Sequence, residues 1–398
     1  MLRVAHKTLD QLAETGYVDT EDSRQSVRAE KIVAETGLLV LAASAVPDED
    51  VAAAADELAK RLLPYARSDR MLMGVALEPA AAWDYSQAHV FLTRLGRPDA
   101  GFDALLRESD AAQSASGRER VPHRVLERNW LRRGLVEASA TERLDPVPTD
   151  GVLESSIDLL TGTREDVYAF SHALMYIGDF GIRPLTWPRA PSDICAEAQG
   201  ALAWCLDEQD YDLAAEVLLA WPQTDSEWSA PAVFALQVLV SVEDRAGFLP
   251  SHTIQLERLR VLAGVEHTNY LLASSYHTIY VMGLLCATTL RSEKFLPAFV
   301  PSSGEMSGAA EQIEPFLRFD RTLHWVDLYL RLSPSQRDAL APLTFGIAVR
   351  RCVEARQFGS VRELLEVAQR VGLTDSPLAS QAAQLIRRLE IVTRLLEN

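Results

Sequence analysis

The sequence lacks the short motifs that usually identify a nucleotide-binding or hydrolytic enzyme. It has no G-x-x-x-x-G-K-[ST] loop, no G-x-G-x-x-G segment after a strand and no G-x-S-x-G elbow. Cysteine is scarce, forms no C-x-x-C pair and occurs at only four distant positions, Cys195, Cys205, Cys286 and Cys352. We therefore predict buried thiols in a reducing compartment, with no nucleotide cofactor.

Positively charged residues are also scarce relative to negatively charged ones. The 398 residues include 39 lysines and arginines against 56 aspartates and glutamates, which gives a formal net charge of −17. This charge is spread along the chain, so the protein should repel phosphate backbones and anionic lipid headgroups. Neither nucleic acid nor a membrane is an expected partner.

The N-terminal sequence MLRVAHKTLDQLAETG has no long apolar stretch and no small-residue cleavage site, so we predict a cytoplasmic protein. The segment 269–290 is long enough to span a membrane and carries no charge unless His277 is protonated. However, its serine, threonine, tyrosine and histidine side chains are too numerous for exposure to lipid. A helix buried on all sides by other protein segments fits this composition better.

Apolar residues recur at three- and four-residue spacing through most of the chain, which predicts an all-α fold. Asp48, Ser333 and Ser376 have the chemistry of N-caps, the last two directly before a proline. Polar or turn-rich breaks are expected at 96–121, 144–151 and 301–308, and the second separates an N-terminal helical region, 1–145, from a C-terminal helical domain, 146–398. The predicted helices are 26–45, 48–66, 80–95, 121–139, 164–178, 192–206, 212–221, 230–242, 255–262, 268–290, 311–318, 322–330, 334–356, 360–371 and 377–396.

Two segments of the C-terminal domain resemble each other in pattern. AWCLDEQDYDLAAEVLL and RRCVEARQFGSVRELLE align when Cys205 is set on Cys352, and Tyr211 then falls on Phe358. Each segment predicts the end of one helix, a short polar turn and a second helix antiparallel to the first. Such antiparallel hairpins stack into an α/α-toroid or a superhelical repeat-like array.

One polar row lies on the predicted helix 164–178 and its end. Tyr168, His172, Tyr176 and Asp179 are spaced by 4, 4 and 3 residues, so they share a sector of about 80° on a helix with 3.6 residues per turn. Asp179 stands at a glycine-flanked helix end, where its carboxylate could turn into a cavity.

A second polar row lies on the predicted helix 268–290 and just before it. His267, Tyr270, Ser274 and His277 also share a sector of about 80° among apolar residues. Burial would lower the pKa of a histidine in such surroundings and leave a neutral imidazole that can accept a proton.

We hypothesise that both rows face one pocket in the C-terminal domain. His172 and His277 are then the acid–base candidates, and Asp179 is the orienting carboxylate. Tyr276 and Tyr280 are candidate hydrogen-bond donors, although they lie further round the helix. The alternative is that all these side chains are satisfied core residues that bond one another and nearby backbone.

Metal binding is less well supported, because no H-E-x-x-H or E-x-x-H motif is present. His324 with Asp327, and His123 with Glu127, have spacings that suit two ligands on one helix. Surface or capping contacts explain both pairs more simply, so no metal is predicted.

The segments HALMYIGDFG and SYHTIYVMGLLCA resemble an uncharacterised actinobacterial family of all-helical proteins found among specialised-metabolite genes. The resemblance covers about residues 150–398. It implies a context of natural-product biosynthesis and draws attention to His172, Asp179, Tyr276 and His277, but it implies no substrate.

These observations favour a helical protein that binds or transforms a small intermediate of specialised metabolism, by acid–base chemistry without a cofactor. The alternative is a non-enzymatic module in which stacked helical hairpins bind a partner protein. An enclosed His/Tyr/Asp pocket would favour the first function, and an exposed groove lined by hairpins the second. The sequence does not determine the oligomeric state.

Overall fold

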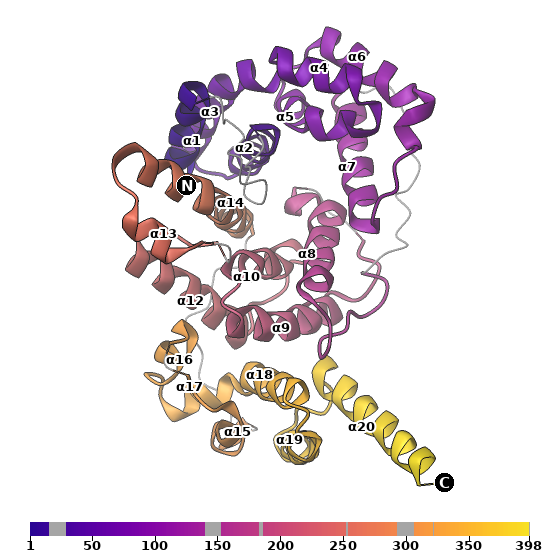
Figure 1. Ribbon diagram of the computed structural model, residues 1–398, viewed down its shortest axis with the longest axis vertical. Coiled ribbons are helices and arrows are strands. Elements are labelled where there is room, and N and C mark those ends of the chain that lie inside the picture. Colours follow the sequence, from indigo (N-terminus) through magenta and orange to yellow (C-terminus); the bar gives the residue numbers. More distant parts are fainter. Residues whose placement is uncertain are drawn as a thin grey trace. The chain divides into compact units, whose positions relative to one another are not determined.

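The computed structural model describes residues 1–15, 29–139, 153–182, 186–251, 254–292, 306–320 and 322–397 (Figure 1). Every regular element in these ranges is a helix, which confirms the all-α prediction. The predicted linker 144–151, with the domain boundary at residue 145, lies outside the described residues.

The chain forms two compact units, each assembled from three stretches. Unit 1 comprises Met1–Gly151, Met175–Leu185 and Thr253–Glu293, and unit 2 comprises Val152–Leu174, Thr186–His252 and Lys294–Asn398. Each unit therefore combines segments that are distant in the sequence. Helix α8 (Arg164–Gly178) is shared, because its residues up to Leu174 belong to unit 2 and those from Met175 belong to unit 1.

Unit 1 is a group of helices around α2. The helices of unit 1, besides the end of α8, are α1 (Leu2–Thr15), α2 (Ala29–Ser44), α3 (Glu49–Ala66), α4 (Asp69–Leu77), α5 (Ala82–Arg94), α6 (Ala100–Ala111), α7 (Pro122–Ser139), α13 (Leu256–Val261) and α14 (Gly264–Arg291), with short turns η1 (Pro79–Ala81), η2 (Gln113–Ser116) and η3 (Asp179–Gly181). α2 packs against α3, α5 and α14, and most of its side chains are buried. At Gly37 an added Cβ would lie only 3.0 Å from the Phe91 ring, so glycine allows the close approach of α2 and α5.

Helix α14 is long and apolar enough to cross a membrane by length and composition alone. In its most apolar window, 67% of the residues are buried inside the protein, and α14 packs against α1 and α2. This burial fits the interpretation of segment 269–290 as a core helix.

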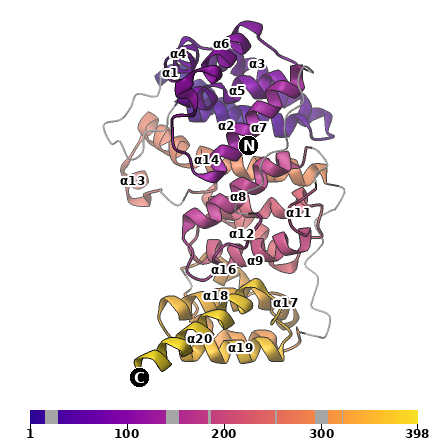
Figure 2. The ribbon, with the colours of Figure 1, turned by 90° about the vertical axis from the view of Figure 1, so that its right-hand side faces the viewer.

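Unit 2 contains two pairs of consecutive helices that pack against each other. Its elements, besides the start of α8, are α9 (Pro191–Asp207), α10 (Tyr211–Leu218), α11 (Ala220–Gln223), α12 (Ala230–Ala246), α15 (Ala309–Leu317), α16 (His324–Tyr329), α17 (Pro334–Ala339), α18 (Ala341–Glu354), α19 (Phe358–Arg370) and α20 (Pro377–Leu396). α9 pairs with α10, α18 pairs with α19, and α9 packs directly against α18 (Figures 1 and 2).

The two hairpins that the sequence comparison predicted have equivalent turns. The Asp210 N–H donates to the Cys205 carbonyl at 2.9 Å, and the Gln357 N–H donates to the Cys352 carbonyl at 2.8 Å. The residue before each donor has a positive φ, 55° at Gln209 and 54° at Arg356. Both helices therefore end in the same left-handed cap, and the predicted hairpins are confirmed as local structures.

Helix starts follow the predicted caps. The Asp48 carboxylate accepts from the Val51 N–H, the Ser376 hydroxyl accepts from the Ala379 N–H, and Ser333 forms a capping box with Gln336. These contacts satisfy N–H groups that have no partner within their own helix.

Several predictions of helix boundaries are wrong, and they include a helix that was missed and a helix that is interrupted. The expected break 96–121 contains α6, which Asp99 caps and which buries Phe102 and Leu106 one turn apart. The expected helix 334–356 is interrupted at Leu340, because Pro342 has no N–H to continue α17 and lies instead in the first turn of α18, which begins at Ala341. In addition, α1 and α4 fall in no predicted range.

Candidate functional site

The first predicted row is divided between the two units. Tyr168 and His172 belong to unit 2, whereas Tyr176 and Asp179 belong to unit 1. We therefore describe the surroundings of each pair within its own unit.

In unit 2, His172 lies in a buried polar cluster with Ser171 and Glu216. The His172 Nδ1 atom lies 3.0 Å from the Tyr168 carbonyl oxygen and 3.4 Å from Glu216 Oε2, and the His172 ring stacks on the Tyr168 ring. The Ser171 hydroxyl donates to Glu216 Oε2 at 2.6 Å. Ser171 and Glu216 are at most 2% exposed, so this cluster is shielded from bulk water.

The geometry of this cluster defines its chemistry. A carbonyl oxygen only accepts hydrogen bonds, so the contact with Tyr168 assigns a proton to His172 Nδ1. In the neutral imidazole the lone pair is then on Nε2, and the Glu216 carboxylate near Nδ1 would stabilise the imidazolium that forms when Nε2 takes a proton. The Ser171 hydroxyl donates to Glu216 and lies 3.4 Å from His172 Nδ1, the protonated nitrogen. Nε2, the nitrogen that could act as a base, therefore does not activate Ser171 as a nucleophile in this geometry.

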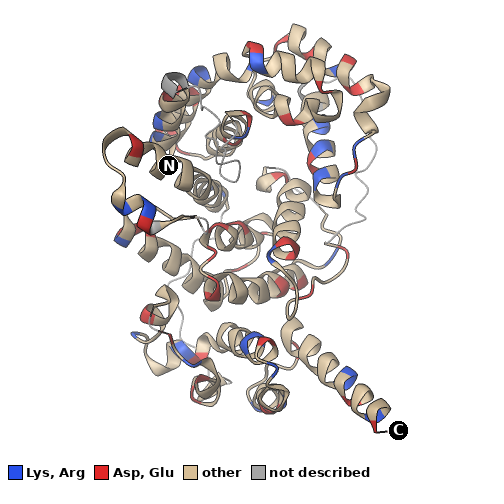
Figure 3. Ribbon diagram, viewed as in Figure 1, with Lys and Arg blue, Asp and Glu red and all other residues tan. Residues whose placement is uncertain are grey.

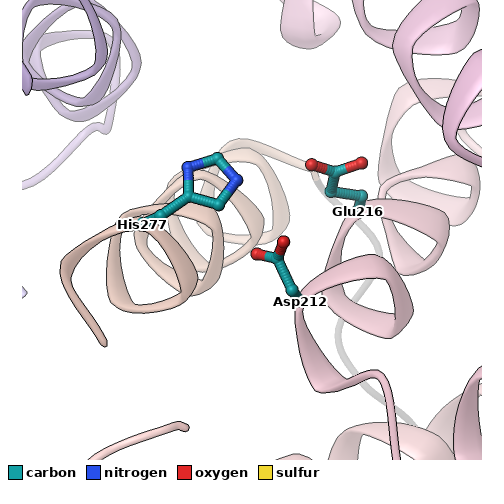
Figure 4. A group of neighbouring side chains, drawn as sticks. All are labelled: Asp212, Glu216 and His277. Atoms are coloured by element: carbon teal, nitrogen blue, oxygen red, sulfur yellow. The ribbon is translucent and has the colours of Figure 1, made fainter. Parts of the chain in front are cut away.

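Arg164 supplies positive charge beside this cluster. It donates to Asp210 at 2.6 Å and lies 3.7 Å from Asp212. Burial opposes the charge of Arg164, but the hydrogen bond to Asp210 and the charges of Asp210, Asp212 and Glu216 together outweigh burial and raise the pKa of the Arg164 guanidinium. Figure 4 shows the Asp212 and Glu216 side chains one turn apart on α10, and the His277 side chain on α14.

In unit 1, Asp179 is held by a bidentate ion pair. Arg94 donates from Nη1 and Nη2 to the two carboxylate oxygens at 2.9 and 2.8 Å, and the Trp130 indole donates to Oδ1 at 2.6 Å. Only 8% of the Arg94 side chain and 13% of the Asp179 side chain are exposed. A cation and an indole therefore hold this carboxylate and anchor the end of α8.

The chain takes an unusual turn at this point. Asp179, Phe180 and Gly181 have consecutive positive φ angles of 45°, 52° and 70°. Left-handed conformations of non-glycine residues cost about 1–2 kcal/mol each, so surrounding contacts must stabilise this turn. The buried Phe180 ring packs against Trp130, and Arg291 donates to the Phe180 carbonyl.

Tyr176 belongs to a neighbouring network in unit 1. Its hydroxyl donates to Glu127 Oε1 at 2.9 Å, and Arg124 pairs with the other oxygen of Glu127 at 2.7 Å. The Tyr176 ring also packs against Trp130.

On α14, the side chains of His277, Tyr276 and Tyr280 contact other residues of unit 1. His277 Nδ1 lies 2.9 Å from the Glu35 carboxylate. Thr36 donates to the Tyr280 hydroxyl at 3.2 Å, and Tyr276 packs edge-on against Tyr280. The contacts of His277 with Glu35 and of Tyr280 with Thr36 connect α14 to α2.

The remaining members of the second row lie near the start of α14. The Tyr270 hydroxyl accepts from the Gln255 N–H at 2.9 Å, and its ring lies under the Arg258 guanidinium. Ser274 donates to the Tyr270 carbonyl of its own helix, and His267 is partly exposed.

Each of the two pairs considered for metal binding, His324 with Asp327 and His123 with Glu127, lies beside an arginine. Arg245 lies 3.2 Å from His324 Nδ1 and 3.6 Å from Asp327, and burial together with Arg245 lowers the pKa of His324. Arg124 pairs with Glu127 in the same way. A guanidinium at these positions disfavours a bound cation.

Unit 2 also contains a groove with a volume of about 390 Å³, between the loop 156–161 and α20. Neither predicted row lines this groove. Its polar side chains are considered below.

Several residues of these networks were not predicted. Glu216 carried a signal, because it is a single carboxylate in the otherwise apolar run LAAEVLLAW. Arg164, Arg94 and Trp130 gave no comparable signal, since their roles depend on partners distant in the sequence.

The sequence profile of a family described as "Domain of unknown function (DUF6895)" matches residues 1–287. The chain belongs to this family. The match includes the N-terminal region, whereas the resemblance noted above covered about residues 150–398. Helices α15 to α20 lie beyond the matched range. No curated protein and no solved structure matches the chain.

Proposed function

We propose that this protein binds a small intermediate of specialised metabolism and acts on it by acid–base chemistry without a cofactor. The observation that supports this function is the buried cluster of His172, Glu216 and Ser171 in unit 2. His172 Nε2 takes a proton from the substrate, and Glu216 stabilises the resulting imidazolium through Nδ1–H. The biosynthetic context rests on the resemblance alone.

Burial is the main argument for a functional role of this cluster. Burial of a carboxylate and an imidazole away from water destabilises the fold unless the two groups are well paired. The contact between His172 Nδ1 and Glu216 Oε2, at 3.4 Å, is longer than a good hydrogen bond, so this pair does not fully offset the cost of its burial. Catalytic hydrogen bonds are often long without substrate and shorten in the complex.

Native mass spectrometry of the full chain purified from its own cells tests this function. We expect a bound small molecule with the wild type, and loss of that mass with His172→Gln and with Glu216→Gln. Glu197→Gln is the matched control, because Glu197 is an equally buried carboxylate of unit 2 that pairs with Arg189. If the first two variants keep the molecule at wild-type occupancy, the proposed function is wrong.

A second candidate function is binding of a partner protein by stacked hairpins. The equivalent turns at Gln209 and Arg356, together with the packing of α9 against α18, favour it. Under this function, substitutions on the exposed surface of the hairpins would abolish partner binding, whereas His172→Gln would not.

A further inference from the structure

We propose that the groove in unit 2 between the loop 156–161 and α20 binds a small anionic molecule with an apolar portion, a carboxylate or a phosphate monoester. The groove is independent of the His172 cluster and has the volume of a small-molecule site, about 390 Å³. Its apolar lining includes Ile157, Leu160 and Leu385. Its polar lining includes Ser380, Gln384 and Arg388 on α20 and Asp158 on the loop, whose carboxylate accepts hydrogen bonds from the loop itself.

The loop side of the groove is already fixed by internal hydrogen bonds. The Asp158 carboxylate accepts from the N–H groups of Leu160 and Thr161, both at 2.9 Å. Across the groove, the Gln381 side chain accepts from the Leu159 N–H and donates to the Ile157 carbonyl. The loop is therefore preorganised, which lowers the entropic cost of ligand binding.

The α20 side of the groove offers donors that the described part of the protein does not use. Ser380, Gln384 and Arg388 follow each other at intervals of four residues, so they lie along one face of the helix. No hydrogen bond or ion pair of these three side chains is found in the described ranges. A hydroxyl, an amide and a guanidinium in one row suit the oxygen atoms of a carboxylate or a phosphate.

Arg388 is the positively charged residue of the groove lining, and the anionic group of the ligand would bind there. The protein carries a net charge of −17, so it repels anions in general and their binding requires a local cation. Figure 3 shows acidic and basic residues mixed along the helices, with arginines on the exposed part of α20. The apolar portion of the ligand would cover Ile157, Leu160 and Leu385.

Isothermal titration calorimetry with the full chain tests this proposal. The probes are hexanoate, hexyl phosphate and, as the uncharged control, hexanol, at constant ionic strength. We expect saturable binding of at least one anion, and the tighter of the two identifies the headgroup. Hexanol should bind at least tenfold more weakly.

Two neighbouring arginines provide matched variants. Arg388→Gln should weaken binding of the anion at least tenfold, because it removes the only guanidinium that lines the described groove. Arg387→Gln is the control, since Arg387 is also exposed on α20 but does not line the groove. The proposal is overturned if neither anion binds, if hexanol binds as tightly as the anions, or if both variants weaken binding equally.

Discussion

Replacing Asp179 with asparagine tests whether the ion pair with Arg94 holds the end of α8. Asparagine has nearly the same size as aspartate and tolerates the left-handed φ of 45°. Its side-chain carbonyl can still accept from the Trp130 indole. The substitution therefore removes mainly the negative charge and one hydrogen bond to Arg94.

The expected cost follows from burial. Removing one partner of a buried ion pair leaves an uncompensated charge and costs about 3–5 kcal/mol. Because the two side chains keep 8% and 13% exposure, we expect the lower end, about 3 kcal/mol. For a unit of this size that loss lowers the melting temperature by about 6–12 °C.

Thermal unfolding followed by circular dichroism measures this effect, with two reference variants. The double variant Arg94→Met with Asp179→Asn removes both charges and should recover about half of the loss or more. Glu257→Gln breaks an exposed pair with Arg260 and should change stability by less than about 0.5 kcal/mol. A loss below about 1 kcal/mol for Asp179→Asn alone would refute the reasoning.

Three further predictions concern other parts of the fold. Arg356→Gly should raise the free energy of unfolding by about 0.5–1 kcal/mol, because glycine adopts a positive φ without strain. Ala355→Gly, at a negative φ, should lower the free energy of unfolding, and thermal melts compare the two variants. Gly346→Val should cost about 1–3 kcal/mol in urea unfolding, because an added Cβ lies 2.9 Å from the Ala203 Cβ. Burial lowers the pKa of His89 in the folded protein below its unfolded value of 6.5. The stability that neutral His89 contributes is therefore fully present above pH 6.5, and it is lost as the pH falls through the folded pKa. Melting temperatures between pH 5 and 8 should therefore fall less steeply on acidification for His89→Gln than for the wild type, and equal slopes would contradict this account.

Local sequence patterns were sufficient for much of the secondary structure. The predicted helices 164–178 and 377–396 have the same bounds as α8 and α20. Proline after a serine cap marks the start of α17 and α20, because a first-turn residue needs no N–H. The predictions were wrong where a single residue sets a helix boundary, as at Asp99, which caps the start of α6, and at Pro342, which lies in the first turn of α18.

The polar rows show the limit of such patterns. Periodicity correctly places Tyr168, His172 and Tyr176 on α8, whereas Asp179 lies just past the end of this helix, in η3 and with a left-handed φ of 45°. Periodicity contains no information on the partner that each side chain meets. Asp179 meets Arg94, 85 positions away, and His172 meets Glu216. The predicted catalytic and binding residues therefore stay predictions until variants are measured.

Local sequence was enough to predict that the protein is helical, where many of its helices begin and end, and that two segments of similar pattern form hairpins. Those features depend on residues within a few positions of each other, through hydrogen bonds of the helix and its caps. Only the tertiary structure decided that three separate stretches form each compact unit, and which arginine, carboxylate and indole groups pair. Those pairs depend on long-range packing, where the burial of a charge selects a partner that no local pattern encodes.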